Sequence, residues 1–130
     1  MNQEEIIAYW RVEAEEALKV AYHLFEKRDY SYALFFGHLA VEKILKALFV
    51  KNEGPDVPRT HNLLRLAKAA QISVSDEQEY DLVRITAFNL EARYPDFKRA
   101  FRKKCTAGFS ANEIKKIQEV FSWLKSMLES

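Results

Sequence analysis

The chain has 130 residues and a formal net charge of +1, and 48% of its residues are hydrophobic. This length suits one domain that buries roughly two-thirds of its unfolded surface, and the apolar content excludes a disordered chain. Three glycines and three prolines are too few for the tight turns of sandwiches, barrels and doubly wound sheets. The composition therefore predicts a single all-helical domain over residues 1–130.

The sequence also indicates the compartment in which the chain works. No uncharged apolar stretch approaches the roughly 18 residues of a membrane span, and the N-terminus is acidic where a signal peptide would be basic. The single cysteine, Cys105, has no partner for an internal disulfide, which suits a reducing environment. We expect a cytoplasmic domain that makes no use of a membrane.

Hydrophobic spacing predicts two long helices in the first part of the chain. Apolar residues from Ile7 to Leu24 recur three and four positions apart, so we expect a helix over residues 3–28. The repeated alanines on this stripe indicate a close approach to a neighbouring helix. Asp29 is the expected N-cap of a second helix, which runs to about residue 52 before a segment with glycine and two prolines.

Capping patterns predict two further helices in the middle of the chain. Thr60 is the expected cap of a short helix over about 61–71. Ser75 opens a capping-box pattern for a helix over about 76–93, and Pro95 ends it.

A last helix is predicted from a second capping-box pattern, in which Ser110 is followed by Glu113. Its apolar stripe, spaced by three and four residues, consists of Ile114, Ile117, Phe121, Leu124 and Leu128. Together these elements predict an all-α, antiparallel bundle of four long helices plus one short helix.

The strongest local electrostatic feature is a basic run in the segment 98–104, which contains no acidic residue. Its bases are Lys98, Arg99, Arg102, Lys103 and Lys104. One interpretation is a solvated loop, the usual fate of a charge run, and the other is a loop that binds phosphates. Phe97 and Phe101 interleave with the bases, so they either stack on nucleic-acid bases or hold the loop against the bundle.

The segment Ala-Arg-Tyr-Pro-Asp at residues 92–96 directly precedes this run. Arg93 falls in the last turn of a predicted helix, where a cation is ordinary dipole compensation. Two interpretations remain open. Either Arg93 bonds Asp96 or Tyr94 in a structural corner, or it is a positioned phosphate-binding arginine beside the basic run.

Other site chemistries lack a supporting pattern. The glycines form no phosphate-binding loop, and the histidines and Cys105 are scattered without the paired spacing of a zinc site, so no metal and no cofactor are predicted. For His38 the structural interpretation is a partly buried helical histidine bonded to a neighbour. His61 is likewise interpreted as structural, at a helix N-terminus.

Three blocks of the sequence carry a resemblance to a known family. Residues 29–48 have an aromatic-rich start that leads to Glu-Lys-x-x-Lys-Ala, residues 59–64 contain Thr-His-x-Leu, and residues 92–96 read Ala-Arg-Tyr-Pro-Asp. In this order, and with the first and last helices, the chain resembles the HEPN (higher eukaryotes and prokaryotes nucleotide-binding) domain family over nearly its whole length. The third block is similar to a signature of one small bacterial and archaeal branch.

The resemblance implies a homodimeric bundle of four or five helices. Many members are encoded beside a minimal nucleotidyltransferase, as in toxin–antitoxin pairs, and the catalytic members are metal-independent ribonucleases. Their motif is an arginine, four to six residues and a histidine, but the positions after Arg93 hold Lys98, Arg99 and Ala100. The resemblance therefore supplies Arg93 as an expected phosphate contact, framed by Tyr94 and Asp96, and does not supply nuclease activity.

The function expected from the sequence is binding of a nucleotide or of RNA or DNA, without catalysis. The expected binding residues are Arg93, Tyr94, Asp96, Lys98, Arg99, Arg102, Lys103 and Lys104. The expected partners are a second copy of the chain and, from the resemblance, a minimal nucleotidyltransferase. The homodimer is also expected because 2 Trp, 6 Tyr and 9 Phe exceed what one small bundle hides.

Two alternatives remain open at this stage. One is a noncanonical metal-independent ribonuclease that uses Arg93 with Lys98 or Arg99 across a dimer. The other is a purely structural protein-interaction module whose basic run only confers solubility.

Overall fold

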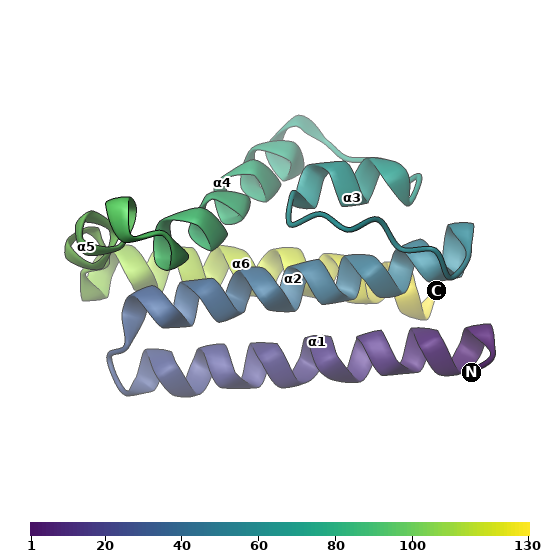
Figure 1. Cartoon of the computed structure of the whole chain (residues 1–130), viewed down its shortest axis with the longest axis horizontal. Helices are drawn as coiled ribbons and strands as arrows, with labels where there is room; N and C mark the ends of the chain where they lie inside the picture. The colour runs from purple at the N-terminus through teal and green to yellow at the C-terminus, as the bar shows by residue number, and fades with distance from the viewer.

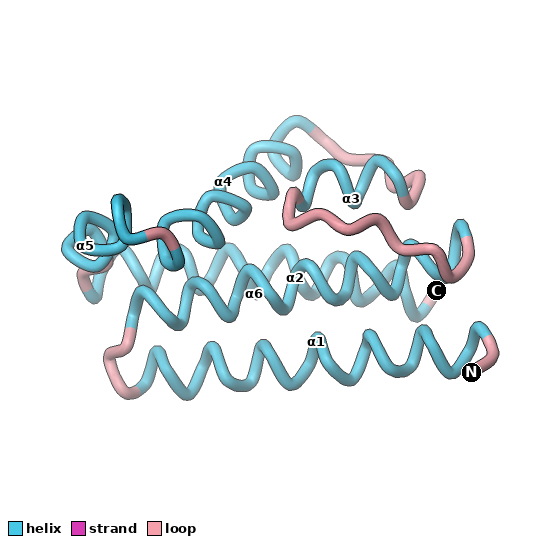
Figure 2. The backbone as a smooth tube through the Cα atoms, in the orientation of Figure 1, coloured by secondary structure: helices cyan, strands magenta, loops and turns pink.

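A computed structural model describes residues 1–130 as six α-helices without a strand (Figures 1 and 2). In chain order the helices are α1 Gln3–Glu26, α2 Tyr30–Glu53, α3 Leu63–Ala69, α4 Asp76–Arg93, α5 Pro95–Lys104 and α6 Ala107–Glu129. The all-α prediction is confirmed, with two short helices where one was expected. None of the six combines the length and the apolar character that a bilayer-crossing helix needs.

Helix α2 is the centre of the bundle and contacts all five other helices. Helices α1 and α4 run antiparallel to it, whereas α6 runs in the same direction as α2 (Figure 1). The direction of α6 follows from the path of the chain, since α4 leads it back to the end of the bundle at which α2 begins (Figure 1). Helix α5 lies at that end, and both chain termini lie at the opposite end (Figure 1).

Small residues let the long helices pack closely against α2. The alanines predicted to face a neighbour are buried in α1, at Ala14, Ala17 and Ala21. On the α6 side, a Cβ atom added to Gly37 would lie 2.6 Å from Cδ1 of Ile117, so glycine is required for this approach. The predicted apolar stripe of α6 is buried along its whole length.

The cap of α4 agrees with the sequence prediction, whereas the caps of α3 and α6 differ from it. Helix α3 begins after Asn62, whose side chain accepts from the backbone N–H of Arg65. Thr60 was the wrong choice because its hydroxyl accepts from the N–H of Asn62 instead and forms a turn that precedes the helix. Asp29 occupies the N-cap position of α2, but its side chain makes no capping hydrogen bond.

The predicted start of α6 was also wrong. Thr106 is its cap and accepts from the N–H of Phe109. Ser110 and Glu113, which resemble a capping box in sequence, lie inside the helix and face inward, where Glu113 pairs with Arg84 of α4. A capping-box pattern cannot by itself distinguish the first turn of a helix from an inward-facing polar pair one turn later.

Candidate nucleic-acid interface

The basic run was expected to be a loop, but it forms helix α5. Pro95 stands in the first turn of α5, where its fixed φ and missing N–H are tolerated, and Tyr94 caps both α4 and α5. Pro95 therefore ends α4 at Arg93, as predicted, and also starts the next helix. The three bases in the last turn of α5 suit the negative end of its dipole.

One aromatic side chain anchors α5 to the bundle. Phe101 is 2% exposed and stacks on Phe88 of α4, with ring centroids 5.7 Å apart. Phe97, one turn earlier, is 47% exposed. Of the two phenylalanines considered as anchors, only Phe101 has that role, and Phe97 stays at the surface.

The bases of α5 fall mainly on one face. At about 100° per residue, Lys98, Arg99, Arg102 and Lys103 occupy an arc of about 140°, which we call the basic face. Lys104 lies outside the arc, and its ammonium is 5.3 Å from the ring centroid of Phe109 on α6. Four of the five predicted bases are therefore brought together, and the fifth is directed elsewhere.

The cations of this region have no acidic partner. No carboxylate lies within 4.0 Å of Arg93 or of any base of α5, although other cations of the chain form ion pairs. Asp96 stands in the first turn of α5, where its charge suits the dipole, and it pairs with no cation. The interpretation of a structural corner held by an Arg93–Asp96 ion pair is therefore wrong.

Arg93 lies beside an aromatic ring at the corner between α4 and α5. Its guanidinium carbon is 5.7 Å from the ring centroid of Tyr94, and both side chains are exposed. A guanidinium in this position keeps its hydrogen-bond donors free for a bidentate phosphate contact. The phosphate-binding interpretation of Arg93 and Tyr94 stays a prediction.

One residue of this surface was missed in the sequence. Tyr32, in the first turn of α2, has its ring centroid 5.5 Å from the ammonium of Lys98. A hydrogen bond from Lys98 lowers the pKa of the Tyr32 hydroxyl, and the charge of Arg102 acts in the same direction. The aromatic-rich start of the second predicted helix was the available signal, but only the fold brings residue 32 next to residue 98.

A buried polar network lies on α2, toward the loop that precedes α3. His38 is 0% exposed, and its Nε2 donates to the carbonyl of His61 at 2.9 Å. His61 Nδ1 donates to Oε1 of Glu42 at 2.7 Å, and Lys46 donates to Oε2 at 3.0 Å. His38 bonds to a neighbour, as expected, but it is fully rather than partly buried, and the nearby Glu42 that binds His61 was not anticipated.

The network shifts the pKa values of Glu42 and His38. Burial opposes ionisation of Glu42, but the hydrogen bonds from His61 and Lys46 outweigh it and leave the pKa of Glu42 lowered. Burial lowers the pKa of His38, and the Arg93 cation contributes in the same direction. Because Nε2 of His38 carries the proton, its Nδ1 is a bare acceptor, and this atom has no partner.

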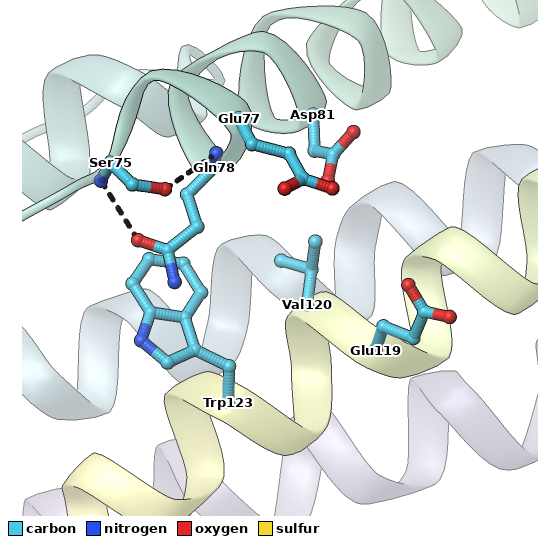
Figure 3. A pocket seen from close by; sticks show the side chains of 7 residues that line it. All are labelled: Ser75, Glu77, Gln78, Asp81, Glu119, Val120 and Trp123. Carbon is cyan, nitrogen blue, oxygen red and sulfur yellow. Dashed lines mark hydrogen bonds between the residues drawn. The ribbon is translucent and has the colours of Figure 1, made fainter.

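A second concave region, between α4 and α6, has the opposite charge. The carboxylates of Glu77, Asp81 and Glu119 line a pocket of about 220 Å³ with Trp123 at one end, as Figure 3 shows. Burial raises the pKa of Asp81. No group of three acidic, histidine or cysteine side chains is arranged to hold a metal ion. This pocket repels phosphate and lies outside the basic surface.

The comparison with protein families agrees with this architecture. A model of the HEPN domain matches residues 7–127, which is nearly the whole chain. Neither the curated proteins nor the solved structures include a match to the sequence. With its all-helical fold and this match, the chain belongs to the HEPN domain family, a family of nucleotide- and RNA-related domains.

Proposed function

We propose that this HEPN domain binds the phosphate backbone of a nucleotide or single-stranded nucleic acid without cleaving it. The observation that carries the proposal is the basic face of α5, whose four cations lack any carboxylate partner. Exposed aromatic rings lie nearby, Tyr32 beside Lys98 and Tyr94 beside Arg93, and such rings stack on bases without regard to sequence. Free cations beside exposed rings favour binding of single strands.

The test of this proposal is the salt dependence of binding to a single-stranded oligonucleotide. The basic face and Arg93 supply five phosphate contacts. At about 0.7 per contact, a plot of log Kd against log salt concentration should have a slope of about 3.5. Affinity should therefore fall roughly 100-fold between 50 and 200 mM salt. An affinity that does not change with salt concentration, or the absence of binding, would favour the alternative of a structural protein-interaction module.

We expect no cleavage of single-stranded RNA by the purified protein in EDTA. No histidine follows Arg93 at the spacing of the family's ribonucleases, and the buried Nε2 of His38 is already bonded to a carbonyl. A missing general acid or base removes roughly 10²–10⁴-fold in rate. Cleavage that disappears in Arg93→Ala would instead establish the alternative, a ribonuclease that uses Arg93 with Lys98 or Arg99.

We also propose that the functional unit is a homodimer formed through a stripe on α4 and α5. The exposed members of this stripe, spaced by three or seven residues, are Tyr80, Val83, Leu90 and Phe97. Helix α4 is thus apolar on its buried side and on its outer side.

The dimer prediction is tested by Leu90→Glu, which places a charge in the middle of the stripe. Sedimentation of the native protein at micromolar concentration should give twice 15.2 kDa, and the variant should give 15.2 kDa. Val12→Glu, at an equally exposed apolar residue of α1, is the control and should remain dimeric. A native protein that sediments as a monomer contradicts the proposal.

A minimal nucleotidyltransferase, as in toxin–antitoxin pairs, is the further partner that we propose from the family resemblance. The supporting observation would be a nucleotidyltransferase encoded in the neighbouring reading frame and retained by the purified domain. A neighbouring frame of unrelated type would remove the basis for this partner.

A further inference from the structure

A small cavity lies between the α1–α2 turn and the last turns of α5. Its volume is about 150 Å³, and its lining includes Arg28, Asp29, Tyr32, Arg102 and Cys105. Arg28 and Asp29 belong to the turn, Tyr32 to the first turn of α2, and Arg102 to the basic face. The cavity thus connects the basic face with the α1–α2 turn, which lies outside the residues expected to bind nucleic acid.

The charges around this cavity are unbalanced. Among the lining residues, Arg28 and Arg102 contribute two cations and Asp29 contributes one carboxylate, so the lining has a net charge of +1. None of these three side chains has an oppositely charged partner within 4.0 Å. An anion that enters the cavity meets donors from two separate segments of the chain, and it replaces no existing ion pair.

The backbone holds the position of Arg28. Its N–H donates to the carbonyl of Phe25 at 3.0 Å, and the N–H of Asp29 donates to that of Leu24 at 2.8 Å. The Arg28 side chain is therefore attached to a turn whose course is fixed by hydrogen bonds. Tyr32 lies opposite, between this turn and Lys98.

The volume of the cavity restricts what can occupy it. About 150 Å³ corresponds to about five water molecules at about 30 Å³ each, whereas sites for drug-sized ligands span about 300–1,000 Å³. A phosphate group fits this space, whereas a whole nucleotide does not. The cysteine in the wall is buried, and burial raises the pKa of the Cys105 thiol to about 11, so it adds no negative charge.

We propose that this cavity binds a phosphate monoester, namely the terminal phosphate of a nucleotide or oligonucleotide, between Arg28 and Arg102. A monoester carries more negative charge than a phosphodiester, which suits a lining with two arginines and one carboxylate. Only one nucleotide chain continues from a monoester, so the cavity needs only one opening. This inference rests on the proposed function and adds to it a site for the end of the bound strand. Inorganic phosphate has the same chemistry and serves as a separate probe.

The direct test measures backbone amide shifts of the intact protein during titration with inorganic phosphate, with sodium chloride at matched ionic strength as reference. Shifts of residues 28–32 should saturate with phosphate, and Arg28→Gln should abolish the saturation. Arg65→Gln, which removes an exposed unpaired arginine of α3, is the matched control and should leave it unchanged. Shifts that stay linear, or that match those in chloride, would overturn the proposal.

A second arm identifies the source of the phosphate. An oligonucleotide with a terminal phosphate should bind about tenfold more tightly than the same sequence without it, and Arg28→Gln should remove this preference. The unphosphorylated strand should keep its salt dependence in Arg28→Gln, since the basic face is intact. Saturation by inorganic phosphate without a strand preference would assign the cavity to free phosphate and overturn the terminal-phosphate proposal.

The two arms also separate this inference from the proposed function. If the unphosphorylated strand binds with the expected salt dependence and phosphate does not saturate the cavity, only the cavity assignment fails. If phosphate saturates the cavity and no strand binds with salt dependence, the proposed function fails. The helical circular dichroism of Arg28→Gln should match that of the native protein, which shows that any loss of phosphate binding does not result from unfolding.

Discussion

Replacing all five bases of α5 with glutamine is expected to abolish most of the binding to single-stranded nucleic acid. The substituted residues are Lys98, Arg99, Arg102, Lys103 and Lys104. With only Arg93 left, the slope of log Kd against log salt concentration should fall from about 3.5 to about 0.7. At 50 mM salt, counterion release by four fewer contacts corresponds to an affinity loss of roughly 4,000-fold.

The fold should survive this replacement. Glutamine and lysine have similar helix propensities, and each of the five side chains is at least partly exposed. A matched control removes five cations from other surfaces: Lys19, Arg59, Arg65, Lys68 and Lys115. Both variants have the same net charge, so only a local site distinguishes them. Equal loss in both would show that the protein binds through its overall charge.

Within the surface, Arg93→Ala should weaken binding more than alanine at any single lysine of α5. The Arg93 guanidinium can hold a phosphate bidentately, whereas an ammonium acts as a point charge. Lys103→Ala on the basic face is the appropriate comparison. If affinity stays unchanged in the quintuple variant, the basic face is a solvated helix surface and the protein-interaction alternative is favoured.

The folded state is expected to lose stability as the pH falls below about 6.5, because His38 is held neutral. Burial lowers the pKa of His38 below its ordinary value of 6.5, so the unfolded chain binds a proton here that the folded chain does not. The stability that neutral His38 provides is fully present above pH 6.5, and it is lost as the pH falls toward the pKa of His38 in the folded state. Within this range the free energy of unfolding should fall by up to about 1.4 kcal/mol per pH unit.

This effect is measured by urea unfolding at several pH values between 7 and 5. His38→Gln should flatten the slope, since glutamine can still donate to the carbonyl of His61 but does not titrate. His23→Gln, at an exposed histidine of α1, should leave the slope unchanged. A slope that survives His38→Gln would assign the loss of stability to another group.

Glu42 adds a second, more acidic transition. Its pKa is lowered from an ordinary value of 4.5, so its contribution is present above that pH and is lost as the pH falls through the folded pKa. Glu42→Gln should lower the free energy of unfolding at pH 7 by about 1–3 kcal/mol, because two charge-assisted hydrogen bonds lose their acceptor charge. The same variant should unfold with less dependence on pH below 4.5.

Local signals in the sequence were sufficient for the long helices. Apolar residues at three- and four-residue spacing identified the buried faces of α1 and α6, and the capping box at Ser75 marked the start of α4. These features depend on neighbours within one or two turns, which a single sequence contains. The absence of a histidine at the required spacing from Arg93 is equally local, and it set the expectation of a non-catalytic domain.

The tertiary structure decided the remaining features, because they depend on residues far apart in the chain. Phe101 stacks on Phe88 of α4 and anchors α5 to the bundle, and Lys104 lies beside Phe109 of α6. Glu113 of α6 pairs with Arg84 of α4, which makes it an inward-facing residue of the helix that Thr106 caps.

The sequence by itself determined the helical class, the buried stripes and the basic composition of residues 98–104. Only the fold decided that Tyr32 lies beside Lys98 and that Glu42 joins His61 to α2. Periodicity is a property of the chain, whereas the partner of a buried or charged side chain is selected when distant segments pack. Polar groups removed from water must find such partners, and that requirement is satisfied in three dimensions.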